Sequence, residues 1–449
     1  MAETNNAERY VAAIEVCSSK IIAAVGKPRE DGRLDIIATD QERCVEGVRY
    51  GIIQNLEETS MRVARILERI ERKPSVTPRV IDGVFVGLSG RSLRSICTEV
   101  KINLPDETEV NEEVLKRLHD QALSTAVDSS LEVVDAIPRL YHVGKQETLQ
   151  PRGMVGNSIS ATYDLIVCRP ELRRMLTRTL TDKLGVQIEG FIVTALSTAQ
   201  VILKPDEKRL GCMLVDIGAE TTAVTIYKGG HLEYFVTLPL GGRNITRDLT
   251  SLGHLLEEKA EELKITSGNA QPRDMASTLN INGVQMNDVS NLIVARAEEI
   301  ALNIVQQIYY AGLKEKDLPG GIICIGGGSK LNGMLDLLKQ LTNMSVRRGE
   351  IPQYIAVEDS KGPSAELIEV ASVLYSGAMT TDVNCLEFPT QEEMPINGST
   401  PNTPEAPGQK GGGTEKLHKP KGKGLFGKFS DRVARFFSDP GEDKSDLIE

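Results

Sequence analysis

Two distant stretches of the chain repeat one pattern of apolar and polar positions. The first is VAAIEVCSSKIIAAVGKPREDGRLDIIATD, from Val11, and the second is CMLVDIGAETTAVTIYKGGHLEYFVTLPLGG, from Cys212. Each begins with an apolar run that ends in an acid, Glu15 or Asp216, and continues through a turn of small residues into two further apolar runs. Such runs predict β-meanders, and their recurrence predicts an internal duplication. Two related sheets would then face each other across a cleft.

Helical periodicity follows each meander. After the first, apolar residues recur at helical spacing in NLEETSMRVARILERIERK, and after the second in ITRDLTSLGHLLEEKAEELKI and VSNLIVARAEEIALNIVQQIYYAGL. The region between the two units contains the apolar run VFVGLSG, the helical pattern VNEEVLKRLHDQALSTA and the strand-like runs LEVVDAIPRLYHV and SISATYDLIVC. It therefore predicts a small inserted α/β domain.

These patterns predict an α/β chain of two lobes with an insertion. The expected divisions are a first lobe at 10–83, continued at 164–205 and 360–386; an inserted domain at 84–163; a second-lobe core at 206–250, continued at 319–359; and a helical subdomain at 251–318. Residues 387–423 are rich in Pro, Gly, Ser, Thr, Asn and Lys, which predicts a flexible linker.

The segment GLFGKFSDRVARFFSDP, residues 424–440, holds four of the eight phenylalanines. On a helix of about 100° per residue its large apolar residues fall within an arc of about 120°, and three basic residues lie outside that arc. The apolar set is Leu425, Phe426, Phe429, Val433, Phe436 and Phe437, and the basic set is Lys428, Arg432 and Arg435. This segregation predicts an amphipathic helix on an anionic membrane surface. Docking on the body of the protein, or on a partner protein, is the alternative.

Composition narrows the class of protein. The length of 449 residues exceeds what one core supports, and the formal net charge of −11 argues against a general nucleic-acid-binding protein. We expect a cytoplasmic body, because the first residues lack a secretory signal pattern and no apolar run approaches the roughly 18 residues of a membrane span. The seven cysteines show no CxxC spacing, so we expect small buried side chains in a reducing compartment rather than metal ligands.

Two glycine-containing motifs predict a nucleotide cleft. In DIGAETT, Gly218 would let the backbone approach a phosphate, Thr221 and Thr222 would donate hydrogen bonds, and Asp216 would hold Mg²⁺ through water. An ordinary hairpin with polar turn residues is the alternative. In IICIGGGSKLNGM, a buried strand runs into three glycines and a helix expected near Ser329, which suits a flat ligand or a diphosphate.

Taken in order, these features resemble the actin-like ATPase superfamily and, within it, the FtsA family of bacterial cell-division proteins. The similarity extends over nearly the whole length. It rests on EGVRYGIIQNLEET, FVGLSGRSLRS, PRGMVGNSI, LGGRNITRDL, KAEELKITSGNA, the triple-glycine strand and GLFGKFSDRVARFF.

The resemblance implies an ATP site with Mg²⁺ built from residues of both lobes. The implied nucleotide-binding residues are Ser18, Ser19 and Lys20 in the first phosphate loop; Asp216, Gly218, Thr221 and Thr222 in the second; and Glu261, Lys264, Gly326, Gly327 and Gly328 around the adenosine. Glu15 and Asp216 would hold Mg²⁺ through water. By spacing alone, Glu261 and Lys264 predict only a solvated helix pair. No catalytic residue is assigned.

Both hairpins depart from the family pattern. The first hairpin of the family usually reads Asp-x-Gly-Thr-Ser, whereas this chain has EVCSS. Glu15 adds a methylene, and Cys17 places a side chain where the backbone should approach phosphate. Ala219 and Glu220 stand where the second hairpin often has glycines, and we expect Glu220 to bring negative charge near the phosphates. At most slow hydrolysis is expected.

The resemblance also implies a function. It is that of an ATP-binding adaptor that self-associates and tethers FtsZ filaments to the cytoplasmic face of the inner membrane at the division site. The tail would bind the membrane, and FtsZ would contact residues 251–318. Two alternatives share the fold: a pilus-assembly scaffold, and a metabolite kinase or phosphatase that uses the same cleft.

Overall fold

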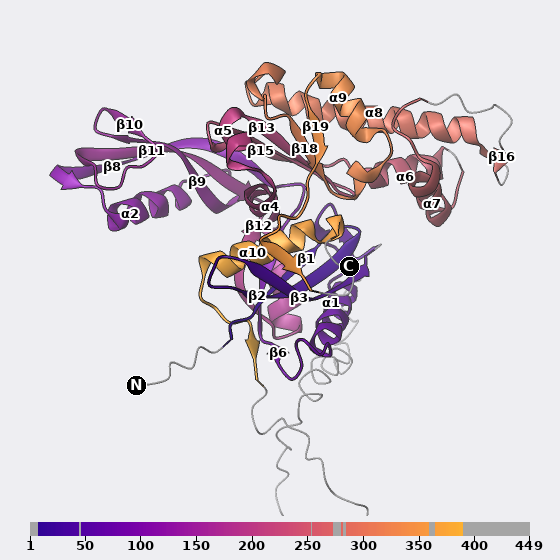
Figure 1. Ribbon diagram of the computed structural model, residues 1–449, viewed down its shortest axis with the longest axis horizontal. Coiled ribbons are helices and arrows are strands. Elements are labelled where there is room, and N and C mark those ends of the chain that lie inside the picture. Colours follow the sequence, from indigo (N-terminus) through magenta and orange to yellow (C-terminus); the bar gives the residue numbers. More distant parts are fainter. Residues whose placement is uncertain are drawn as a thin grey trace, which may run out of the picture.

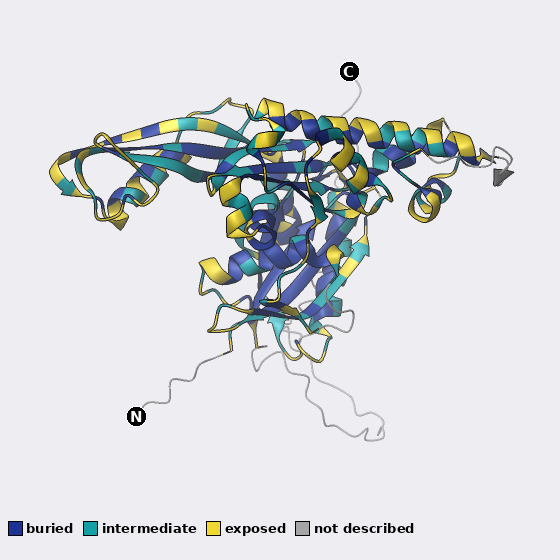
Figure 2. Ribbon diagram, turned by 45° about the horizontal axis from the view of Figure 1, so that its top comes forward, coloured by how far each residue is buried: buried dark blue, intermediate teal, exposed yellow. Residues whose placement is uncertain are grey.

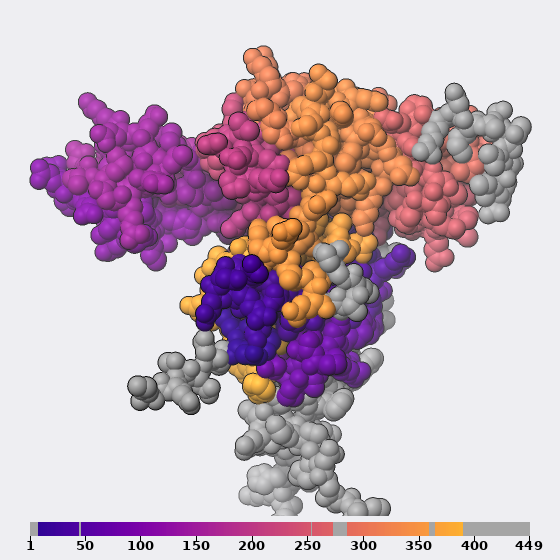
Figure 3. All heavy atoms as spheres, viewed as in Figure 1, coloured from indigo at the N-terminus to yellow at the C-terminus, as the bar shows by residue number. Residues whose placement is uncertain are grey.

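The computed structural model describes residues 8–388, apart from residues 45, 253, 273–279, 282–283 and 359–363. The chain forms two lobes. The second lobe carries the inserted domain on one side and the helical subdomain on the opposite side, and both project away from the first lobe (Figure 1). The space-filling view shows these two projections well separated from each other (Figure 3). The expected amphipathic helix at 424–440 lies outside the described residues, as does the expected linker beyond Phe388.

The first lobe is built on a six-stranded sheet. Its strands, in spatial order, are β12 (Gln187–Val193), β7 (Gly83–Leu88), β1 (Val11–Val16), β2 (Lys20–Pro28), β3 (Leu34–Arg43) and β20 (Ile355–Val357). Strands β1, β2 and β3 form an antiparallel meander. Beyond β1, β7 pairs in parallel with β1, and β12 pairs in parallel with β7. Parallel strands are buried on both faces, which explains why β7 is apolar throughout.

The second lobe repeats this arrangement within a nine-stranded sheet. Its strands, in spatial order, are β10 (Gln146–Thr148), β9 (Glu132–Val143), β11 (Val155–Cys168), β8 (Arg94–Glu109), β15 (His231–Leu238), β14 (Thr222–Lys228), β13 (Cys212–Ile217), β18 (Ile322–Ile325) and β19 (Val346–Arg348). The meander β13–β14–β15 is antiparallel, and β18 and β19 extend it in parallel beyond β13.

The two meanders match residue for residue at their first strands. Glu15 and Asp216 are each the fifth residue of a six-residue strand. Glu15 pairs with Ile22 across its hairpin, and Asp216 pairs with Ala223. The duplication predicted from the apolar pattern is confirmed.

The inserted domain continues the second-lobe sheet. Its helix α2 (Glu112–Leu123) packs against β8, β9 and β11 over a separate apolar core. A single ladder pair, Val236 with Arg94, joins β15 to β8. Arg139 on β9 reinforces this junction, because its guanidinium lies 2.8 Å from Glu233 on β15 and 2.7 Å from Asp164 on β11.

The structure corrects the expected limits of the insertion and of the second lobe. The run VFVGLSG contains β7, which pairs with β1 and β12 of the first lobe, so a boundary at residue 84 is too early. Likewise β20 pairs with β3 of the first lobe before residue 360. An apolar strand has the same local pattern in either sheet, so periodicity alone misplaces it.

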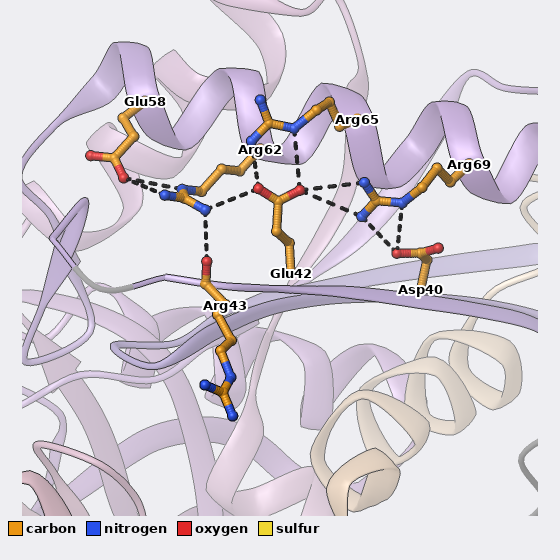
Figure 4. A network of polar contacts seen from close by, with 7 residues as sticks. All are labelled: Asp40, Glu42, Arg43, Glu58, Arg62, Arg65 and Arg69. Atoms are coloured by element: carbon orange, nitrogen blue, oxygen red, sulfur yellow. Dashed lines mark hydrogen bonds and ion pairs between the residues drawn. The ribbon is translucent and has the colours of Figure 1, made fainter. Parts of the chain in front are cut away.

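Helix α1 (Leu56–Glu71) covers one face of the first sheet, with its apolar stripe buried and Asn55 as its N-cap. The side of α1 that faces β3 carries Arg62, Arg65 and Arg69, which all bind Glu42 of that strand (Figure 4). Arg69 also lies 2.8 Å from Asp40. This network holds the helix to its own sheet and lies within one lobe.

Helix α10 (Ile368–Thr380) packs against β1, β2, β7 and α4 (Thr194–Ile202), and most of its residues are buried. The buried sheets and α10 form the dark centre of the molecule in Figure 2, whereas exposed residues line the outer faces of α2 and α8.

The remaining first-lobe and connecting elements are β4 (Val48–Arg49), β5 (Ile52–Ile53), β6 (Val80–Ile81), α3 (Glu171–Thr177), the π-helix η1 (Arg178–Lys183), α5 (Pro205–Leu210), the 3₁₀ helix η4 (Ala365–Leu367) and β21 (Leu386–Glu387).

The second-lobe helices differ from the expected pattern in two places. One expected long helix is two helices, α6 (Gly242–Ser251) and α7 (Glu257–Ser267). The glycines lead into a 3₁₀ turn, η3 (Gly327–Lys330), and the α-helix α9 (Met334–Thr342) begins later than Ser329. The other elements are α8 (Met286–Tyr310), the short strands β16 (Asn280–Ile281) and β17 (Val284–Gln285), and the 3₁₀ turn η2 (Glu315–Asp317).

All seven cysteines are free thiols, and five of them are buried as expected. Cys97 on β8 is exposed, which corrects its expected burial, and Cys17 is partly buried. Within the described ranges, no helix is both long and apolar enough to cross a bilayer.

Candidate functional site

The acids near the ends of β1 and β13, Glu15 and Asp216, are brought together between the two lobes. Glu15 is almost fully buried, and its charge contributes to the raised pKa of Asp216. Lys20 lies beside them, with its Nζ 3.6 Å from Glu369 Oε2 on α10. The same Nζ donates to the carbonyl of Glu366 at 2.6 Å. Three carboxyl groups and one ammonium therefore gather between the lobes, and we refer to them as the floor of the cleft.

Sequence reasoning missed Glu369. A signal for it existed, because Glu369 is an acid near the start of the otherwise apolar helix IEVASVLYSGAMT. A carboxylate in a buried helix is rare unless it is paired. Its partner Lys20 is far away in sequence, so the pairing itself was not visible there.

Burial sets the protonation of this floor. Desolvation raises the pKa of Glu15 to about 8, and the charge of Glu369 adds to the effect. Desolvation also raises the pKa of Asp216, again with a contribution from Glu369. Burial alone would lower the pKa of Lys20, but Glu369 and its neighbours raise it. Within the described residues, Glu15 Oε2 and Asp216 Oδ1 are buried without a hydrogen-bond partner.

The first hairpin is closed by its own backbone. Cys17 N donates to the carbonyl of Lys20 at 2.9 Å, and the carbonyl of Ser19 accepts from Cys44 N at 2.9 Å. Ser18 Oγ accepts from Gly51 N at 3.0 Å, so its hydroxyl hydrogen remains to donate elsewhere. Burial and the charge of Glu15 raise the pKa of the Cys17 thiol, which therefore stays neutral.

The second hairpin is anchored to the start of α6. The carbonyls of Gly218 and Ala219 accept from Gly242 N at 2.9 Å and Arg243 N at 2.7 Å. Thr222 is buried, and its hydroxyl donates to the carbonyl of Leu240 at 2.8 Å. The one hydroxyl hydrogen of Thr222 is thus used within the protein, contrary to its predicted role as a phosphate donor.

Glu220 does not present its charge to the cleft as expected. Its carboxylate accepts from Arg49 Nη1 at 2.9 Å, from Tyr50 N at 2.7 Å and from Arg247. Arg243 Nη1 lies 3.5 Å away. The expected repulsion between Glu220 and a phosphate is corrected, because three guanidinium groups surround the carboxylate.

Glu261 and Lys264 form a partly buried pair, with the Lys264 side chain 14% exposed and the Glu261 side chain 41% exposed. Lys264 Nζ donates to Glu261 Oε2 at 2.6 Å, to Thr246 Oγ1 at 2.9 Å and to the carbonyl of Gly242 at 3.1 Å. Burial lowers the pKa of Lys264 despite the neighbouring Glu261. The pair thereby lies against the start of α6.

The glycines that follow β18 allow this part of the chain to lie close to the second hairpin. A Cβ on Gly326, at φ +81°, would lie 2.3 Å from Asp216 Oδ1, and one on Gly328 would lie 2.4 Å from Ile217 Cγ2. A Cβ on Gly242 would lie 3.6 Å from the Gly328 Cα and 3.8 Å from Lys264 Nζ. Gly327 is exposed, and no described atom lies within 4 Å of a Cβ placed there. Of the three, only Gly327 has open space beside its Cα.

An actin-like fold is defined by two duplicated meander units that enclose a cleft. Each unit here has an acid at the same position of its first strand. A solved chain of the PilM–PilN type IV pilus biogenesis complex shares this fold, with a TM-score of 0.58 and 15% sequence identity over 83% of this chain and 99% of that chain.

Sequence comparison then gives the family. The family model "Cell division protein FtsA" matches residues 213–365, and "SHS2 domain inserted in FTSA" matches residues 90–167, so that together they cover just over half of the chain. The cell division protein FtsA of Porphyromonas gingivalis is 29% identical over 86% of this chain and 84% of its own length. That of Pseudomonas aeruginosa is 25% identical over 89% and 95%. The chain belongs to the FtsA family of cell division proteins.

Proposed function

We propose that this protein binds ATP, self-associates and tethers FtsZ filaments to the cytoplasmic membrane at the division site. The observation that carries the proposal is the joining of an actin-like body to the basic and aromatic segment 424–440. From residue 416 to 435 there are seven Lys or Arg and one acid, in a chain of net charge −11. Such a segment suits the anionic, cytoplasmic side of the inner membrane.

The direction in which the chain leaves the fold supports this arrangement. The last described strand, β21, pairs with β6 at the end of the first lobe that lies away from the second lobe (Figure 1). A tail that starts there would place the first lobe toward the membrane. The helical subdomain would then project from the opposite part of the molecule.

We assign FtsZ binding to that subdomain, residues 251–318. Leu252, Leu256 and Ile265 are exposed there to 64%, 81% and 63%. Exposed apolar side chains gathered in one region are typical of protein interaction sites. A reversible membrane helix also works best when many copies are tethered in a row, which favours self-association or recruitment by a filament.

The cleft would hold ATP with its phosphates between the two hairpins. Ser18, Ser19, Lys20, Gly218 and Thr221 are the proposed phosphate contacts, supported by their position around the floor. Glu261, Lys264 and the three glycines are the proposed adenosine contacts. Hydrolysis would be slow at most.

Mg²⁺ fits this floor only through water. Within the described residues no three His, Cys, Asp or Glu side chains are placed to hold a metal ion directly. Mg²⁺ normally keeps several waters and uses one or two carboxylates with the phosphates of its nucleotide. The unpartnered Glu15 Oε2 and Asp216 Oδ1 are suited to accept hydrogen bonds from those waters. The ion would neutralise phosphate charge.

The test is co-sedimentation of the full chain with anionic vesicles, with and without ATP and FtsZ. We expect the protein to pellet with vesicles and to carry FtsZ with it. Phe436→Glu, or a chain ending at Lys423, should lose both effects, because the aromatic face no longer inserts. Lys428→Ala is the matched control and should weaken binding modestly, mainly at low salt. Vesicle binding by the truncated chain would contradict the proposal.

A further inference from the structure

The turn of the second hairpin carries a carboxylate that the proposed nucleotide contacts do not use. The Glu220 side chain has no solvent exposure, although it lies in the short connection between β13 and β14. A buried charge is stable only where it is paired and hydrogen-bonded. The partners of Glu220 come from both lobes.

The first lobe supplies two donors from one short segment. Arg49, the last residue of β4, donates to Oε1, and the backbone N–H of Tyr50 donates to Oε2. Both oxygens are thus engaged across the interface between the lobes. The second lobe supplies Arg247 and Arg243 from α6, and Arg247 also donates to the Tyr50 hydroxyl at 3.3 Å.

Glu220 is ionised in this setting. Burial would raise its pKa, but the Tyr50 N–H and the Arg49 guanidinium, with Arg243 and Arg247, more than offset burial and lower the pKa. One negative charge among three guanidinium groups leaves an excess of positive charge beside the hairpins. That excess attracts an anionic ligand rather than repelling it.

The same segment continues to the first hairpin. Gly51 N donates to Ser18 Oγ at 3.0 Å. Tyr50 has φ +51°, which a residue with a side chain adopts only where its surroundings impose it. At Gly51, φ is +78° and any Cβ would lie 2.4 Å from the carbonyl oxygen of Ser89. The backbone here therefore has no freedom to shift without breaking these contacts.

We infer that Glu220 is a positioning residue that holds the two phosphate hairpins at a fixed separation before any nucleotide binds. Two hydrogen bonds from adjacent backbone amides connect the hairpins: Gly51 N donates to Ser18 of the first, and Tyr50 N donates to Glu220 of the second. The inference rests on the proposed ATP site. ATP would meet a preformed phosphate site, and preformed sites bind more tightly because less order must be created on binding.

The first test measures hydrogen exchange in the nucleotide-free protein. The readout is the segment 48–53, whose Tyr50 and Gly51 amides donate to Glu220 and Ser18. In Glu220→Gln and in Arg49→Gln we expect exchange there to be at least about tenfold faster. Arg49→Gln guards against misfolding, because the Arg49 side chain is 44% exposed.

The matched control is Arg65→Gln. Arg65 is 49% exposed and also binds a glutamate, but its partner Glu42 belongs to the same lobe (Figure 4). We expect Arg65→Gln to leave exchange of the segment 48–53 at the parent rate. Unchanged exchange in both Glu220→Gln and Arg49→Gln would overturn the inference.

The second test separates positioning from general damage by calorimetry with ATP and with adenosine. Glu220→Gln should bind ATP at least about tenfold more weakly but adenosine as the parent does, because only phosphates lie between the hairpins. Equal losses for both ligands would overturn the positioning role. If the variants exchange faster but the parent protein does not bind ATP, the contact between the lobes is upheld and the proposed function is overturned instead.

Discussion

The two hairpins occupy the same place in two copies of one fold, but they are held in different ways. The first is closed by its own backbone, has a thiol at Cys17 in its turn and carries the buried Glu15 on its first strand. The second is bonded through Gly218 and Ala219 to α6, and through Glu220 to the first lobe. Charge crowding in the floor affects the acids of both hairpins, Glu15 and Asp216, whereas the second hairpin also provides the connection to the other lobe through Glu220. Duplication preserved the strand register and left the turns to diverge.

The largest effect should come from filling the open space beside Gly327 of η3. Gly327→Asp would place a carboxylate where the cleft is open, so it would exclude the ligand and repel its phosphates. We expect ATP affinity to fall by about 100-fold or more, because like-charge contact costs several kcal/mol. Calorimetry measures the loss. The melting temperature should stay at the parent value, since no described atom lies within 4 Å of the new Cβ.

The first hairpin should respond in the opposite direction. Glu15→Asp combined with Cys17→Gly brings it back to the family pattern and lets the backbone approach a phosphate. We expect steady-state phosphate release to rise by about 10- to 100-fold, because a misplacement of about 1 Å can cost about 100-fold in rate. Brisk release by the unaltered protein, with no gain in the double variant, would show that these two residues do not limit hydrolysis.

A smaller effect is expected in the pH dependence of stability. The pKa of Glu15 is raised to about 8 in the folded protein, from 4.5. Between these values the folded state holds more protons than the unfolded state, so the free energy of unfolding falls as pH rises, at up to about 1.4 kcal/mol per pH unit. Glu15→Gln removes this contribution.

Urea unfolding between pH 5 and 8 checks that expectation. The profile of Glu15→Gln should be flatter than that of the parent, with the largest gain in stability at pH 8. Asp382→Asn, which changes a fully exposed carboxylate, is the control and should leave the profile unaltered. The burial of Glu15 would be contradicted if the free energy of unfolding of the parent rose from pH 5 to 8 and Glu15→Gln removed that rise.

The smallest effect is expected at an exposed contact between the lobes. Lys330 of η3 lies 3.0 Å from Glu366 of η4, and the two side chains are 45% and 49% exposed. Lys330→Ala should lower the free energy of unfolding by less than about 1 kcal/mol, because water screens exposed ion pairs. A loss as large as that of Glu220→Gln in the same urea titration would show that the buried and the exposed contacts contribute alike.

Local pattern was sufficient to determine much of this fold. The meanders, α1, α2 and α8 follow from apolar periodicity, since that periodicity reflects which face of each element is buried. The correspondence of Glu15 with Asp216 was likewise visible as an acid near the end of each first strand. The glycines predicted a close approach to a ligand, whereas a Cβ on Gly326 or Gly328 would meet Asp216 or Ile217 of the second hairpin.

Only the tertiary structure determined which residues far apart in sequence become partners. Arg49 and Glu220 are 171 residues apart, and no periodicity relates them, so the predicted repulsive charge is in fact a paired one. Glu369 became part of the cleft only because α10 packs beneath β1. The strand β7 joined the first lobe because burial on both faces selects an apolar strand without specifying its sheet. A sequence records what each segment must bury, whereas the charge state and role of a buried group depend on which distant segment meets it.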